Sequence, residues 1–96
     1  MYVLITYDVN TSSENGQKRL RQVAKCCKDF GQRVQNSIFE CLIDGSDFVR
    51  LKTKLLGLID TDLDSIRIYQ LGKNYQTKIE HHGAETSFEI EGELII

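Results

Sequence analysis

The stretch Met1-Tyr-Val-Leu-Ile-Thr-Tyr-Asp-Val-Asn10 decides how this chain is organised. Between Tyr2 and Tyr7 it is a short apolar run rich in β-branched and aromatic residues, which is typical of a strand buried on both faces. The run stops at Asp8, and a polar loop follows. A carboxylate beside a core is costly unless it is paired, hydrogen-bonded or bound to a metal. Two interpretations of Asp8 therefore stay open: it caps the following turn or helix, or it is a metal ligand.

The residues after this loop predict a helix with two unlike faces. Its start lies between Ser13 and Gln17, and Gly31 suits its C-terminal end. One face is apolar at i, i+3, i+4 and i+7 spacing, and the opposite face carries a single stripe of cations. No acid stands within that stripe, so it is either a solvated face or a surface for an anionic partner. The apolar positions are Leu20, Val23, Ala24, Cys27 and Phe30, and the cationic ones are Lys18, Arg21, Lys25 and Lys28.

Beyond this helix the pattern predicts two strands, a second helix and a further strand. The apolar phase of residues 32–43 shifts near position 36, which indicates that two strands meet at Gln35–Ser37. Residues 44–47 break the chain and supply a cap, and residues 48–59 have the spacing of an amphipathic helix. Residues 60–64 predict a solvated acidic loop, and residues 65–71 a strand that is apolar on both parities. Residues 75–80 predict one more short extended piece.

The order strand, helix, strand, strand, helix, strand is the split βαβ, or ferredoxin-like, arrangement. It predicts an α+β domain over residues 1–72, with an antiparallel sheet and both helices on one face. Residues 2–9 and 65–71 are apolar on both parities, so one helical layer leaves a sheet face uncovered, and a homodimer through the sheet faces would cover it. Residues 81–96 are too poor in hydrophobes to fold alone. Residues 73–96 are predicted to form a C-terminal extension that pairs with a sheet edge and docks on the partner subunit or on another protein.

Composition places the chain among ordinary soluble proteins of one domain. No apolar run approaches the roughly 20 residues that span a bilayer, and Met1 leads into the first strand without a basic leader region. We therefore expect a cytoplasmic protein that does not bind membranes. The three cysteines form no C-x-x-C pair, and they are predicted to be reduced core residues.

The net charge of −2 is unevenly distributed. Residues 16–43 hold six Lys and Arg against two acids, whereas residues 80–96 hold five Glu and no Lys or Arg. Such segregation predicts a basic surface for an anionic partner and an acidic tail for a different one.

Three segments form an ordered set: Ile5-Thr-Tyr-Asp-Val9, Lys18-Arg-Leu-Arg21 and Gly31-Gln-Arg-Val-Gln-Asn-Ser-Ile-Phe-Glu40. Together with Ser65-Ile-Arg-Ile-Tyr69 and Glu80-His-His-Gly-Ala84, they resemble the CRISPR-associated protein 2 family, the small subunit of the spacer-acquisition machinery. The Arg-x-Gln-x-Ser-hydrophobic-Phe pattern is more specific than the Tyr-Asp-Val signal. The resemblance covers nearly the whole chain.

This resemblance implies a ferredoxin-like homodimer in which Asp8 is the catalytic, metal-binding aspartate, contributed once by each subunit at the interface. Several members are Mg²⁺-dependent endonucleases, some on single-stranded RNA and some on double-stranded DNA. In acquisition the dimer bridges two dimers of the integrase subunit and holds duplex DNA, a role for which nuclease activity can be dispensable. Mg²⁺ often takes only one or two carboxylates, which suits two Asp8 side chains across a two-fold axis.

The residues predicted to bind nucleic acid are cations, which would contact phosphates without reading sequence. They are Lys18, Arg19, Arg21, Lys25 and Arg33.

Two other functions stay open. One is a toxin-like ribonuclease, because the VapD toxin family resembles this one in fold and in its strand-one aspartate. Cleavage of cellular RNA by the isolated protein would favour it. The other is a non-catalytic regulatory dimer that binds a small ligand, and nucleic-acid binding would count against it.

Overall fold

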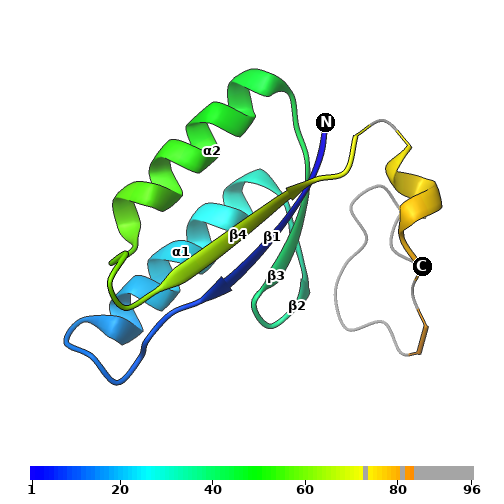
Figure 1. Ribbon diagram of the computed structural model, residues 1–96. Coiled ribbons are helices and arrows are strands. Elements are labelled where there is room, and N and C mark those ends of the chain that lie inside the picture. The colour runs from blue at the N-terminus through cyan, green and yellow to red at the C-terminus, as the bar shows by residue number, and fades with distance from the viewer. Residues whose placement is uncertain (73, 81, 84–96) are drawn as a thin grey trace.

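The computed structural model describes residues 1–72, 74–80 and 82–83 (Figure 1). Its elements follow the predicted order, with a short 3₁₀ helix, η1, after the last strand. They are β1 (Tyr2–Asp8), α1 (Gly16–Phe30), β2 (Gln32–Gln35), β3 (Ile38–Leu42), α2 (Gly45–Leu58), β4 (Ser65–Gln70) and η1 (Tyr75–Lys78).

The four strands form one sheet in the order β2-β3-β1-β4, and every neighbouring pair is antiparallel. Both helices cover the same face of this sheet, and η1 lies on the other side (Figure 1). In the central strand β1, Ile5 pairs with Phe39 of β3 and with Ile68 of β4. The predicted ferredoxin-like α+β fold is therefore confirmed.

The core lies between the sheet and the helices, and β1 supplies its centre. Alternate residues of a strand point to opposite faces, and one set of β1 side chains packs with the buried residues of both helices. The other set points to the face without helices, and Asp8 belongs to it. The core side chains of β1 are Val3, Ile5 and Tyr7, and those that meet them include Val23 and Cys27 of α1 and Leu51 and Leu55 of α2.

The sheet face without helices, here called the open face, is partly covered by the chain that follows β4. The Lys78 ammonium donates to the Leu71 carbonyl over 2.8 Å, and a cavity of about 360 Å³ separates this segment from the sheet. Its lining includes Leu4, Ile38 and Ile79. The same lining includes the polar residues Gln35 and Glu40, so this face carries apolar and polar side chains together, and the homodimer through the sheet faces stays a prediction.

The predicted extended piece over residues 75–80 is wrong in part, because Tyr75–Lys78 is a 3₁₀ helix. The turn is closed by Thr77, whose N–H and hydroxyl both donate to the Asn74 carbonyl, over 3.2 and 2.9 Å. The rest of the predicted extension, residues 73, 81 and 84–96, lies outside the described residues.

The boundaries of the helices and of the hairpin follow local signals in the sequence. Helix α1 begins within the predicted interval, and the Asp44 carboxylate caps α2 by accepting the Asp47 N–H over 2.7 Å. Strands β2 and β3 meet at the predicted turn, and their register shifts between Arg33 and Gln35. Nowhere in the described part of the chain is a helix both long and apolar enough to cross a membrane.

Gly31 ends α1 as expected, but for a different reason. Glycine often follows a helix because it adopts the left-handed conformation, whereas φ of Gly31 is −163°, in the extended region. A Cβ atom at this position would lie 2.3 Å from the Glu40 carbonyl oxygen and 2.5 Å from Cys41 Sγ. Glycine is therefore required by the close approach of the helix end to β3.

We expect Gly31→Ala to lower the free energy of unfolding by about 1–3 kcal/mol, the usual cost of overpacking. Gly57→Ala is the matched control, since nothing lies within 4 Å of a Cβ there. Gly57 is helical, so alanine should stabilise the protein by up to about 1 kcal/mol. Urea denaturation of both variants measures the two effects, and the same sign in both would contradict the close-approach explanation.

The three cysteines are buried, as predicted, and none of them forms a disulfide. Burial raises the pKa of both Cys27 and Cys41 to about 12. Both thiols therefore stay protonated at neutral pH and contribute to the core as small hydrophobes.

Candidate functional site

Asp8 is the last residue of β1, and its side chain is exposed at the rim of the open face. Its neighbours Tyr7 and Val9 both belong to the core, so Asp8 points the opposite way. Its register partner on β4 is Ser65. Across the described ranges, no group donates a hydrogen bond to the Asp8 carboxylate, and Asn15 is the N-cap of α1 without a side-chain bond. The interpretation of Asp8 as a cap is therefore wrong.

The carboxylate that does organise this end of the molecule is Asp64, whose side chain is fully buried. It accepts hydrogen bonds from the N–H groups of Asn10 and Asp60, both over 2.9 Å, and from Arg19 Nε over 2.8 Å. The prediction of a solvated acidic loop is therefore wrong for Asp64. Two of its partners are 54 and 45 residues away in sequence, so no local pattern could have indicated this role.

Arg19 donates hydrogen bonds to the loop between β1 and α1 as well as to Asp64. Its guanidinium donates to Ser13 Oγ over 2.8 Å and to the Glu14 carbonyl over 2.9 Å. Only 13 % of its side chain is exposed. Arg19 and Asp64 thus form a buried ion pair, here called the clasp, and Arg19 lies apart from the exposed cations of α1. The role of Arg19 as a phosphate contact stays a prediction.

The ion pair between Arg19 and Asp64 predicts how the free energy of unfolding changes in acid. The Arg19 guanidinium, followed by backbone N–H groups, lowers the pKa of Asp64 from 3.8 to about 2. A carboxyl whose pKa is lower in the folded state stabilises the fold above its unfolded pKa, and this contribution is lost as pH falls towards the folded value. We expect the loss between about pH 4 and pH 2. Urea denaturation at pH 6 and pH 3 should show a smaller difference in Asp64→Asn than in the native protein. An equal difference would contradict the assignment.

The exposed face of α1 carries the predicted basic stripe, namely Lys18, Arg21, Lys25 and Lys28. One detail is corrected: the Lys25 ammonium lies 3.6 Å from the Asp29 carboxylate. With side chains 78 % and 56 % exposed, this pair is screened by solvent and holds the cation only weakly. The stripe therefore remains available to an anionic partner.

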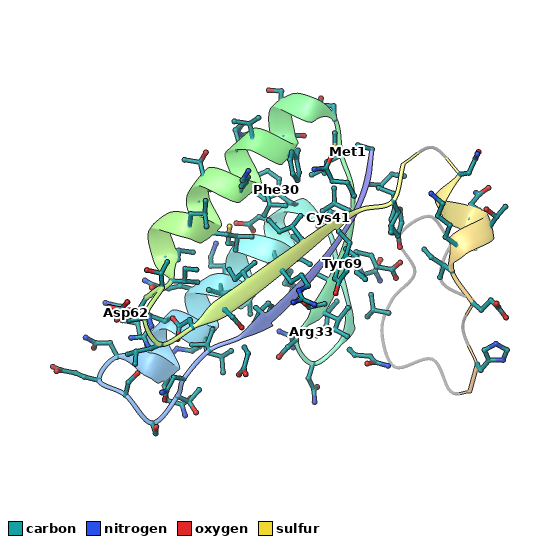
Figure 2. All side chains as sticks on the ribbon, in the orientation of Figure 1. Met1, Phe30, Arg33, Cys41, Asp62 and Tyr69 are labelled. Atoms are coloured by element: carbon teal, nitrogen blue, oxygen red, sulfur yellow. The ribbon has the colours of Figure 1, made fainter. Side chains whose placement is uncertain are left out.

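Arg33 lies apart from Asp8. Its guanidinium carbon stands 5.2 Å from the centre of the Phe39 ring, and Phe39 stacks with Tyr7 on the helix-facing side of the sheet. Burial raises the pKa of Tyr7, and the nearby Arg33 partly offsets this rise. Arg33, labelled in Figure 2, therefore lies on the helix-facing side of the sheet, whereas Asp8 belongs to the open face.

Sequence reasoning missed Arg67, an exposed residue of β4. It pairs with Thr6, two residues before Asp8, so it shares the open face with Asp8 as a diagonal neighbour. Its Nη1 donates to the Tyr69 hydroxyl over 3.4 Å. Alternation along residues 65–69 shows which side chains share a face, but only the pairing of β4 with β1 brings Arg67 to Asp8.

The oxygen ligands near Asp8 can be compared with those that Mg²⁺ requires. The described residues contain no group of three or more His, Cys, Asp or Glu that could hold a metal ion. Mg²⁺ is often held by one or two carboxylates while keeping several waters. An exposed Asp8 carboxylate fits one such ligand, and a second copy of the chain would provide another. The loop after β1 leads directly into α1, so the first turns of the basic stripe lie at the same end of the molecule (Figure 1).

Known proteins resemble this chain over most of its length. Residues 1–79 match the family described as CRISPR associated protein Cas2. A CRISPR-associated endonuclease Cas2 of Halalkalibacterium halodurans is 59% identical over 95 residues, covering 99% of both chains. A CRISPR-associated endoribonuclease Cas2 of Chlorobaculum tepidum is 51% identical over 96 residues, covering all of both.

Solved structures agree with these matches. The crystal structure of Streptococcus pyogenes Cas2 superposes with a TM-score of 0.75 at 57% identity, covering 86% of this chain and 100% of the other. A hypothetical protein of Thermus thermophilus superposes with a TM-score of 0.73 at 27% identity, covering 88% and 93%. The match over residues 1–79 and the high identity to full-length relatives show that the chain belongs to the CRISPR associated protein Cas2 family.

Proposed function

We propose that this protein is a metal-dependent endonuclease subunit of the CRISPR spacer-acquisition machinery. The observation that carries the proposal is the exposed Asp8 carboxylate, unengaged by any described residue, at the rim of the open face in a chain of the Cas2 family. Relatives named endonuclease and endoribonuclease support hydrolysis of a phosphodiester.

In this proposal two copies associate through their open faces, and each contributes one Asp8. Mg²⁺, when bound, would polarise the phosphate and acidify a bound water. The Asp8 carboxylates would hold the ion, and Arg67, on the same face, would offer a cation to a phosphate oxygen. A single chain offers only one carboxylate here, so a monomer should be a poor catalyst.

The basic stripe on α1 orients the nucleic acid. Lys18 and Arg21 stand in the first two turns of the helix that follows the Asp8 loop. A strand whose phosphates run along these cations can therefore reach the end of β1. Such contacts are independent of sequence.

The test is cleavage of labelled single-stranded RNA and double-stranded DNA by the purified protein, with and without Mg²⁺ and a chelator. We expect products only with Mg²⁺, and a dimer in sedimentation at micromolar concentration. Cleavage that persists in chelator, or a stable monomer, would refute the metal site or the assembly. Cleavage confined to cellular RNA would favour a toxin-like ribonuclease, and failure to bind any nucleic acid would favour a regulatory dimer.

The proposed role in spacer acquisition requires a protein partner. We expect the full chain to co-purify with an integrase subunit and to bridge two of its dimers on duplex DNA. The acidic tail, residues 84–96, offers four Glu and no Lys or Arg to a basic partner. Removal of residues 82–96 should weaken this association or the dimer, whereas unchanged co-purification and an unchanged dimer would show that the tail is dispensable.

A further inference from the structure

The buried Asp64 carboxylate connects the start of β4 to the loop that leaves β1. Ser65, the next residue, is the register partner of Asp8. The Asp64 carboxylate accepts the N–H of Asn10, two residues beyond Asp8, over 2.9 Å. The side chain thus extends the pairing of β1 and β4 past its last pair of residues. As a result, Asp8 stands between a paired strand and a loop that is itself held in place.

Arg19 fixes the orientation of this carboxylate. Its Nε lies 2.8 Å from Asp64 Oδ2 and its Nη2 lies 3.3 Å from Oδ1, so a planar fork meets both oxygens. The loop is also packed tightly on the helix start, since a Cβ on Gly16 would lie 2.2 Å from the Asn10 carbonyl oxygen. The backbone that follows Asp8 therefore has little room to move.

We propose that Asp64 is a positioning residue for Asp8: clamped by Arg19, it holds the Asn10 N–H and so sets where the Asp8 carboxylate stands when it binds a metal ion. This inference rests on the function proposed above. Asp64 does not touch the metal in this arrangement and acts through the backbone. Groups that orient a ligand are worth about tenfold to a hundredfold in metal affinity or activity.

The test measures Mn²⁺ affinity by electron paramagnetic resonance on the full chain, without nucleic acid. Asp64→Asn keeps the size of the side chain but replaces one of its two acceptor oxygens by a donor, which cannot meet the N–H groups around it. We expect the dissociation constant for Mn²⁺ to rise about tenfold to a hundredfold. In a cleavage assay the Mg²⁺ concentration for half-maximal rate should rise likewise, while the rate at saturating Mg²⁺ is largely retained.

Two controls separate positioning from a general loss of stability. Asp62→Asn makes the same chemical change in the same loop, at an exposed residue labelled in Figure 2. Asp44→Ala removes the cap of α2 and so lowers stability away from Asp8. Both should keep the Mn²⁺ affinity within about twofold of the native value, as surface and distant changes usually do.

If Asp64→Asn does not fold, Arg19→Lys is the second variant, because it keeps the charge and loses the planar fork. It should weaken Mn²⁺ binding in the same direction. The inference is overturned if Asp64→Asn, or Arg19→Lys where Asp64→Asn does not fold, binds Mn²⁺ with the native affinity. So does equal weakening in Asp44→Ala, or the absence of Asp8-dependent Mn²⁺ binding in the native protein.

The outcomes distinguish this inference from the proposed function. Mn²⁺ binding that depends on both Asp8 and Asp64, without any cleavage, would support the positioning role and refute the nuclease. Metal-dependent cleavage by the native protein, together with unchanged Mn²⁺ affinity in Asp64→Asn, would support the nuclease and refute the positioning role.

Discussion

Asp8→Asn should fold, dimerise and bind nucleic acid as the native protein does, yet lose metal-dependent cleavage by at least about a hundredfold. Asparagine keeps the shape of the side chain but lacks the charge that holds Mg²⁺. No described residue donates a hydrogen bond to the Asp8 carboxylate, and the side chain is exposed, so its replacement should leave the fold intact. The measurement is the initial rate of cleavage of labelled RNA and DNA at saturating Mg²⁺.

Asp62→Asn is the matched control for this substitution, since it removes an exposed carboxylate from another loop. It should cleave at the native rate. Equal cleavage by Asp8→Asn and the native protein, once contaminating nuclease is excluded, would show that the site is wrongly assigned. Absence of cleavage from both would remove the nuclease and leave a binding and bridging role.

Replacing Lys18, Arg21 and Lys25 together by alanine should weaken nucleic-acid binding and reduce its dependence on salt. Each phosphate contact releases about one condensed counterion, so three lost contacts lower the slope of log affinity against log salt by about 2.7 on a duplex. All three side chains are exposed on one face of α1, so the fold should tolerate the change. Affinities at several salt concentrations give the slope.

A second triple variant removes the same net charge elsewhere. Arg50, Lys52 and Lys78 are also exposed, and their replacement by alanine should change the salt slope far less. Equal effects of the two triple variants would show that binding follows total charge rather than the stripe on α1. The design leaves Arg19 unchanged, because its loss would disturb the clasp with Asp64.

Local patterns in the sequence predicted much of the fold. Period-two alternation and the phase shift near Asn36 predicted the hairpin, and helical spacing predicted α1 and α2. These signals suffice because strand and helix periodicity, turns and caps depend on residues close together in the chain. Exposure of the α1 stripe was predictable for the same reason. The segment after β4 carried no such periodicity, and its helical turn depends on contacts with Asn74.

The sequence by itself determined the family, the strand and helix order, and the candidate Asp8. Only the tertiary structure decided which carboxylate is buried, because Asp64 has its partners in distant segments. It also decided that Gly31 is needed for close packing, and that Arg67 rather than Arg33 shares the face of Asp8. The physical reason is the same in each case: burial and pairing across a sheet depend on which distant residues meet, and this cannot be read from spacing along one segment.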